Sequence, residues 1–195
     1  MDNIIREILK IIEDKSRVLD LGCGDGELIY QLMELKEVYG LGIDINTEQV
    51  LKCIKRGVSV IQEDIDSALE QYQDKSYDYV VLSETLQALK KPDYVLNQIV
   101  RIGNKAIIAF PNFGYYRIRL QLLFTGRMPK NRELPYDWYN TPNIHLLTIK
   151  DFKEFCAKNS IKILKEIYHS GEGKKKVTGP ANLFAEEAIF LIQKR

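Results

Sequence analysis

The feature that most constrains this chain is a glycine-rich turn at residues 20–26, which reads Asp20-Leu-Gly-Cys-Gly-Asp-Gly26. Residues 17–21, which read Arg-Val-Leu-Asp-Leu, predict a short buried strand that enters the turn, and residues 27–36 have the leucine spacing of an amphipathic helix. Glycines allow a positive φ and let the backbone approach a ligand closely. In doubly wound sheets, ligands bind beyond the carboxyl ends of the strands. We therefore expect the turn to line a ligand site.

Strands and helices alternate along the first part of the chain. Besides the pair already described, the pattern predicts helices at residues 2–14, 47–56 and 92–101, and strands at residues 38–43, 58–61, 77–82 and 105–110. This alternation predicts right-handed crossovers and an α/β fold with a Rossmann-like, doubly wound, mostly parallel sheet. The pattern stops after Pro111 and resumes with a helix at 148–159 and strands at 162–168 and 188–193. No boundary divides the chain, so we expect one domain over residues 1–195.

Composition excludes several classes of protein. The chain has 195 residues, and its formal net charge is only +1, which argues against a nucleic-acid partner. No apolar run is long enough to span a membrane, and the N-terminus lacks the apolar core of a signal peptide. The three cysteines form no CxxC pair, so we expect neither a metal site nor a disulfide framework. A reduced, cytoplasmic protein is the natural interpretation.

The acidic residues of the turn favour a cationic ligand over a dinucleotide. The dinucleotide pattern GxGxxG would place its third glycine at position 27, where Glu27 stands. Asp20, Asp25 and Glu27 oppose the pyrophosphate that such a turn would otherwise hold. S-adenosylmethionine carries a sulfonium and an ammonium, which nearby carboxylates favour. A Rossmann dehydrogenase is a distant third hypothesis.

Two further acids end the next predicted strands. Asp44 is placed to accept hydrogen bonds from both ribose hydroxyls of a nucleotide. Asp64 is placed to accept one from an adenine amino group, with Ile45 and Ile65 as apolar walls. The alternative is that each acid only caps the helix that follows it. Cys23, inside the turn, is expected to be a small buried residue and not a nucleophile.

Four segments together resemble the class I S-adenosylmethionine-dependent methyltransferases: residues 18–26, 42–44, 63–64 and 76–82. The resemblance implies a seven-stranded sheet whose last strand, 188–193, lies antiparallel. It also implies S-adenosylmethionine or S-adenosylhomocysteine as the cofactor. The candidate cofactor contacts are Asp20, Gly22, Cys23, Gly24, Gly26, Asp44, Ile45, Asp64, Ile65 and Ser83.

A more specific resemblance runs through the rest of the chain. Residues 56–62, 82–87, 110–114, 126–129, 134–139 and 141–145 are similar to the MetW family of methionine-biosynthesis proteins. That resemblance implies a methyltransferase-like partner subunit that supports a MetX-like homoserine O-acyltransferase, the enzyme that forms O-acetyl- or O-succinylhomoserine. It leaves open whether the chain forms an oligomer. The alternative is an active methyltransferase that acts on a small molecule or a protein.

The sequence offers only weak candidates for a catalytic base. The Asn/Asp-Pro-Pro-Tyr turn of nucleobase and amide methyltransferases is missing after the strand at 77–82, where the chain reads Leu82-Ser-Glu-Thr-Leu86. Glu84 and His145 are the residues able to accept a proton there. The competing interpretation makes Glu84 an acid at a helix N-terminus and His145 a packing histidine.

The segment 112–147 is rich in aromatic and basic side chains and lacks a regular pattern. We expect it to form a partner surface, with Tyr115, Arg117, Arg127 and Trp138 as anchors, because aromatic residues and arginine are enriched at interface hot spots. A cap over an acceptor pocket is the second interpretation. Nucleic-acid binding is a third interpretation, which the balanced net charge and the acids Glu133 and Asp137 within the segment disfavour. The remaining alternative is that the aromatic residues only pack against the end of the sheet.

Overall fold

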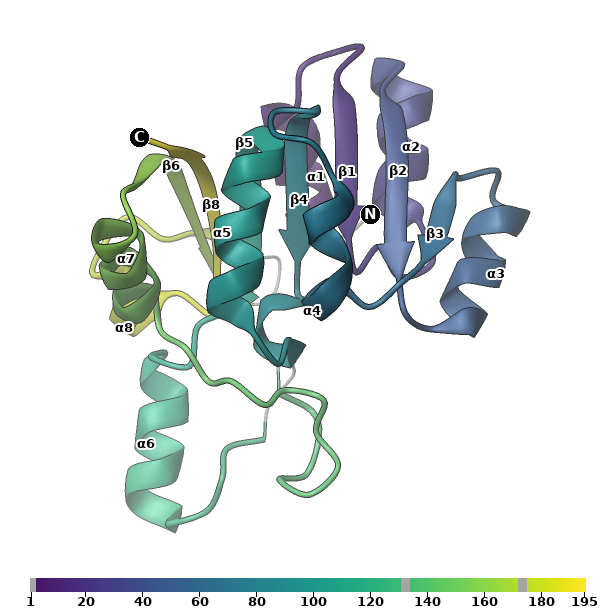
Figure 1. Ribbon diagram of the computed structural model, residues 1–195. Coiled ribbons are helices and arrows are strands. Elements are labelled where there is room, and N and C mark those ends of the chain that lie inside the picture. Colours follow the sequence, from purple (N-terminus) through teal and green to yellow (C-terminus); the bar gives the residue numbers. More distant parts are fainter. Residues whose placement is uncertain (1–2, 131–133, 172–174) are drawn as a thin grey trace.

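The computed structural model describes residues 3–130, 134–171 and 175–195, which build one sheet with the strand order β3-β2-β1-β4-β5-β8-β6-β7 (Figure 1). The first five strands run parallel, and β8 lies antiparallel between β5 and β6. The expected mostly parallel sheet with an antiparallel last strand is confirmed. The strands are β1 Arg17–Leu21, β2 Tyr39–Asp44, β3 Val60–Gln62, β4 Tyr77–Ser83, β5 Gly103–Pro111, β6 Ile161–Ser170, β7 Lys175–Lys176 and β8 Glu187–Lys194.

The sheet has one strand more than the seven expected. The additional strand is the two-residue β7, which pairs with the end of β6 at the edge of the sheet. Two residues are too few for an alternating pattern, so the sequence around Lys175 gives no strand signal. The other seven strands agree with the expected ones within a few residues at each end.

Helices cover both faces of the sheet (Figure 1). They are α1 Asn3–Ile11, α2 Glu27–Lys36, α3 Thr47–Lys55, α4 Ile65–Ala68, α5 Pro92–Ile102, α6 Tyr116–Thr125, α7 Ile149–Lys158 and α8 Ala181–Phe184, with single 3-10 turns η1 Leu69–Gln71 and η2 Leu86–Ala88. Helices α4, α5 and α7 pack on one face, and α1 and α2 on the other. None of the helices among these described residues is long and apolar enough to cross a membrane.

The central strands are buried on both faces, which explains their nearly continuous apolar sequence. Along β4, Tyr79 and Val81 pack against α1 and α2, whereas Val80 and Leu82 pack against α5. Phe110, Phe152 and Phe190 stack where α7 covers β5 and β8. This core holds the carboxyl ends of β1 to β4 in a fixed row.

The segment after β5 contains a helix that the sequence did not predict. Helix α6 projects from the body of the molecule (Figure 1), and Ile118 is its only buried residue. Its apolar side chains are spread around the helix instead of along one side, so the usual amphipathic spacing is lacking. The expectation of an irregular segment throughout 112–147 was therefore wrong for residues 116–125.

Candidate functional site

The glycine-rich turn connects β1 to α2, and its glycines adopt left-handed conformations. Gly22 has φ +73°, and a Cβ added to it would lie 2.3 Å from Oγ1 of Thr85. Gly24 has φ +56°, and a Cβ there would meet nothing within 4 Å. Position 22 therefore requires a glycine, because a side chain there would collide with Thr85. At Gly24 the backbone faces open space.

That open space belongs to a cavity of about 560 Å³ at the carboxyl ends of β1, β2, β3 and β4. The structure brings seven of the sequence-predicted residues to its wall: Gly22, Gly24, Asp44, Ile45, Asp64, Ile65 and Glu84. Residues that the sequence analysis missed complete it: Asn46, Gln49, Asp66, Thr85, Ala88, Leu89, Lys90, Pro142 and Asn143. We call this the strand-end cavity.

Four of the candidate cofactor contacts do not line the cavity. Asp20 is 3% exposed, and burial, with a smaller contribution from the charge of Asp44, raises its pKa to about 7. Cys23 is buried 3.8 Å from the sulfur of Cys53, and burial raises the pKa of its thiol, so it is no nucleophile. Gly26 packs against Cys53, and the Ser83 carbonyl accepts a hydrogen bond from Thr85.

Asp44 is held in place by backbone amides on both sides. Its Oδ2 accepts a hydrogen bond from the Gly24 N–H at 2.8 Å, and its Oδ1 accepts one from the Asn46 N–H at 2.9 Å. Each carboxylate oxygen retains capacity for a further donor. The cap of the following helix is Asn46, not Asp44. Asp44 therefore joins the turn to the end of β2 and presents an oriented acceptor to the cavity.

Asp64 both caps a helix and lines the cavity, the two roles that the sequence left open. Its side chain accepts a hydrogen bond from the Asp66 N–H at 3.0 Å and caps α4, and the residue also lines the cavity. Asp66 in turn accepts from the backbone amides of Lys90 and Lys91, at 2.9 and 2.7 Å. These bonds fix α4 and Ile65 against the loop after β4.

The negative charge of the cavity comes from the strand ends and not from the turn itself. Asp25, expected to act on the ligand, pairs with Arg56 at 2.8 Å and does not line the cavity. The acids of the wall are Asp44, Asp64, Asp66 and Glu84, and the basic residue is Lys90. Such a site favours a cationic or neutral ligand and disfavours a pyrophosphate.

The two candidate bases lie in different places. Glu84 lines the cavity directly after β4 and has a left-handed φ of 53°, a conformation uncommon for a residue other than glycine. His145 borders two other hollows and not the strand-end cavity, and its backbone N–H donates to the Gln87 carbonyl at 3.0 Å. Of the two candidate bases, only Glu84 is therefore placed to act on a ligand in this cavity.

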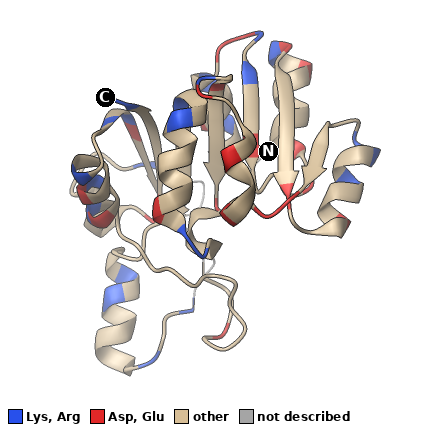
Figure 2. Ribbon diagram, in the orientation of Figure 1, with Lys and Arg blue, Asp and Glu red and all other residues tan. Residues whose placement is uncertain are grey.

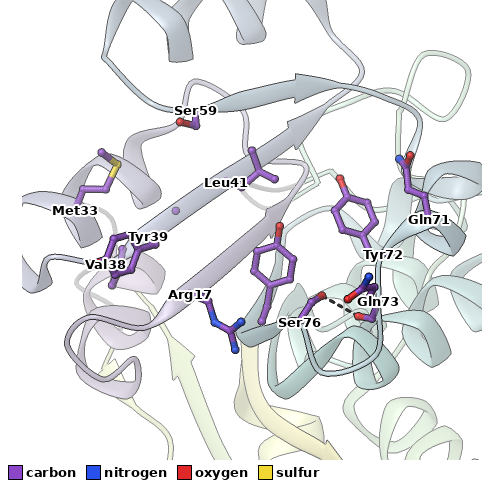
Figure 3. Close-up of a pocket in the computed structure, with 12 residues that line it drawn as sticks. Arg17, Met33, Val38, Tyr39, Leu41, Ser59, Gln71, Tyr72, Gln73 and Ser76 are labelled. Carbon is purple, nitrogen blue, oxygen red and sulfur yellow. Dashed lines mark hydrogen bonds between the residues drawn. The ribbon is translucent and has the colours of Figure 1, made fainter.

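A second hollow has a volume of about 690 Å³, and Figure 3 shows the residues that line it. It lies at the end of the strands opposite to the strand-end cavity. Its lining includes residues at the starts of β1, β2 and β4, namely Arg17, Tyr39 and Ser76. Arg17 is paired with Asp78, and Ser76 donates to the Gln73 carbonyl at 2.8 Å. The hollow is larger than the strand-end cavity, but it lacks the glycine turn and acids. The strand-end cavity is therefore the candidate site.

The fold and the cavity together define a class I methyltransferase-like protein. A structure described as an S-adenosylmethionine-dependent methyltransferase and possible histamine N-methyltransferase, from Thermotoga maritima, aligns at TM-score 0.71 with 14% identity over 98% of this chain and 91% of that one. The [4+2]-cyclase SpnF aligns at TM-score 0.67 with 14% identity over 98% of this chain and 80% of its own.

Sequence comparison is more specific. The family model described as "Methionine biosynthesis protein MetW" matches residues 3–192. The bifunctional methionine biosynthesis protein MetXA/MetW of Rhodopirellula baltica is 34% identical over 94% of this chain and 31% of its own length. The chain belongs to the MetW family, as its sequence motifs indicated. It spans about a third of the length of the curated relatives it matches.

Proposed function

We propose that this chain binds S-adenosylmethionine or S-adenosylhomocysteine and supports a MetX-like homoserine O-acyltransferase as a partner subunit. The observation that carries the proposal is the Rhodopirellula relative, whose name joins MetXA and MetW in one protein. Two activities fused in one chain are held at a high effective concentration, which favours a functional contact between them. The same contact between separate chains needs a docking surface.

The residues of the strand-end cavity fit an adenosyl ligand. Asp44 would accept hydrogen bonds from the ribose hydroxyls, and Asp64 would accept one from the adenine amino group beside Ile65. The turn leaves Gly24 open to the ligand. When bound, S-adenosylmethionine would supply an electrophilic methyl group. The acids of the wall would favour its positive charge.

The alternative function is methyl transfer to an acceptor of unknown structure. Glu84 favours it, because a carboxylate in the cavity is able to take a proton from an acceptor. The likeness to SpnF weakens it, because a chain of this fold carries the name of a cyclase.

The three free, buried cysteines suit a reducing compartment, and we place the protein in the cytoplasm.

The test is reconstitution with the homoserine O-acyltransferase of the same organism. Both proteins are purified, mixed and analysed by size-exclusion chromatography, and acyl transfer to homoserine is measured with and without this chain. We expect co-elution and a faster or more stable acyl-transfer activity. Two proteins that elute separately, with acyl transfer unchanged by the addition, would overturn the proposal.

A further inference from the structure

Helix α6 displays apolar side chains that the rest of the described chain does not cover. Leu123 is 74% exposed and Phe124 is 79% exposed, and Leu120 and Leu122 are also exposed. Trp138 is 76% exposed and stacks edge-on against Tyr139. Both residues belong to the loop that precedes α7, which extends below the sheet as α6 does (Figure 1). Exposed large apolar side chains that gather in one part of a molecule are typical of an interaction site. We call α6 together with Trp138 and Tyr139 the α6 surface.

The α6 surface differs from the one expected from the sequence. Tyr115 is 4% exposed and packs against Tyr116, so it cannot anchor a partner. Arg117 and Arg127 are exposed, as the expectation required. Lys130 pairs with Asp137 at 2.9 Å, which joins the chain after α6 to the neighbourhood of Trp138.

The charge of the α6 surface indicates what covers it. Residues 112–130 contain Arg117, Arg119, Arg127 and Lys130 and no acid, and Figure 2 shows basic but no acidic residues on α6. The acid next to Trp138, Asp137, is paired with Lys130, so the unpaired charge is basic. Arg119 donates to the Gly114 and Asn182 carbonyls, whereas Arg117 and Arg127 face solvent. A two-fold contact with a second copy would place like charges together. The surface instead fits an apolar groove bordered by acidic residues.

The α6 surface is connected to the strand-end cavity by residues 140–147. Pro142 and Asn143, four and five residues after Trp138, line the cavity. The next two backbone N–H groups, of Ile144 and His145, donate to the Gln87 carbonyl at 2.9 and 3.0 Å. The Gln87 side chain donates to the Glu84 carbonyl at 2.7 Å. The cavity wall and Trp138 therefore belong to one short stretch of chain, residues 138–147, which these hydrogen bonds join to the loop after β4.

We propose that the α6 surface docks into an apolar groove of the acyltransferase that is bordered by acidic residues; this inference rests on the proposed function. Binding of the adenosyl ligand strengthens this docking through residues 140–147. Ligand contacts hold Pro142 and Asn143 in one conformation, which lowers the entropy cost of ordering Trp138 at the interface. By linkage, the partner strengthens ligand binding by the same factor.

The docking surface is tested with a double variant, Leu123→Ser with Phe124→Ser, and with a matched control, Leu35→Ser with Ile54→Ser, which removes exposed apolar residues from α2 and α3. Affinity for the purified acyltransferase is measured by calorimetry. We expect binding to weaken about tenfold or more in the α6 variant and to stay near wild type in the control. Equal affinity of both variants and wild type would place the interface elsewhere. A wild-type chain that fails to bind would overturn the proposed function itself.

The coupling is tested by repeating the wild-type titration with saturating S-adenosylhomocysteine, after its binding to the chain alone has been measured. We expect the partner affinity to rise about fivefold or more, and the ligand affinity to rise by the same factor when the partner is present. Unchanged or weaker partner binding would overturn the coupling. A chain that does not bind S-adenosylhomocysteine would overturn both the cofactor and the coupling, whereas the docking surface is decided by the serine variants.

Discussion

At the scale of single residues, Asp44 is the side chain on which nucleotide binding should depend most. Asp44→Ala removes the carboxylate proposed to accept from the ribose hydroxyls, and it also leaves the Gly24 amide without its acceptor. We expect the binding free energy of S-adenosylhomocysteine to weaken by about 1.5–3 kcal/mol, the range for hydrogen bonds to a charged group. Calorimetry measures this loss, and a thermal melt checks that the variant is folded. An unchanged affinity would show that Asp44 only positions the turn.

The buried carboxyl of Asp20 gives the fold a pH dependence that can be measured. Because burial raises its pKa to about 7, the folded state keeps the proton while the unfolded state loses it near the ordinary value of 3.8. The contribution of Asp20 to the free energy of unfolding is therefore largest at acidic pH and declines between about pH 4 and pH 7. Above pH 7 this contribution is constant.

The variant Asp20→Asn should remove this decline, because an amide does not titrate. We expect the variant to be more stable than wild type above pH 7, by on the order of 2–4 kcal/mol. Urea unfolding at a series of pH values measures the difference between the two proteins. Parallel stability curves for wild type and variant would show that the Asp20 pKa does not change on folding.

At the scale of elements, α6 should tolerate changes on its exposed side and not at its one buried position. Ile118→Ala leaves a cavity under the helix and is expected to cost about 2–4 kcal/mol of unfolding free energy. The Leu123→Ser and Phe124→Ser changes should each stay within about 0.5 kcal/mol of wild type, as surface substitutions usually do. Denaturant unfolding distinguishes these outcomes. A large loss of stability from the serine changes would mean that α6 packs its outer side against the body.

The sequence predicted those elements whose side chains follow a simple periodic pattern. The buried strands and the amphipathic helices α1, α2, α3, α5 and α7 carry such patterns, and the expected ranges agree with the structure. The pattern fails for α6, whose apolar residues surround the helix, and for the two-residue β7. The four-residue helices α4 and α8 were not predicted either, because they are too short to carry a periodic pattern. Helix α6 and β7 lie where the chain leaves the common sheet core and is no longer constrained by two buried faces.

The candidate site likewise contains residues that the sequence predicts and residues that it does not. Gly22, Gly24, Asp44 and Asp64 could be predicted, because each lies at the end of a strand recognisable in the sequence. Thr85, Lys90, Pro142 and Asn143 could not, because tertiary packing alone brings those loops to the cavity. Asp20, Cys23, Gly26 and Ser83 have the right sequence positions but do not line the wall. Their direct contact with a cofactor stays a prediction.

At the scale of the whole molecule, the two proposed functions differ in whether S-adenosylmethionine gives up its methyl group. The strand-end cavity is bordered after β4 by Glu84 and Thr85, and these residues do not form the turn that grips an acceptor carbonyl in nucleobase and amide methyltransferases. Methyl transfer depends on holding the acceptor in line with the departing sulfur, and without that positioning the rate should be low.

We therefore expect little transfer of a labelled methyl group to amino acids, catechols or nucleobases, at rates no higher than those of Asp44→Ala. The measurement is scintillation counting of the acceptors after incubation with labelled S-adenosylmethionine, with and without the acyltransferase. If an acceptor is methylated with many turnovers, Glu84→Gln separates the possible roles of that residue. A fall of about 10²–10⁴-fold in rate at unchanged cofactor affinity would identify Glu84 as the base and favour the methyltransferase alternative. An unchanged rate would mean that the bound acceptor needs no base, as for an amine that reacts in its neutral form.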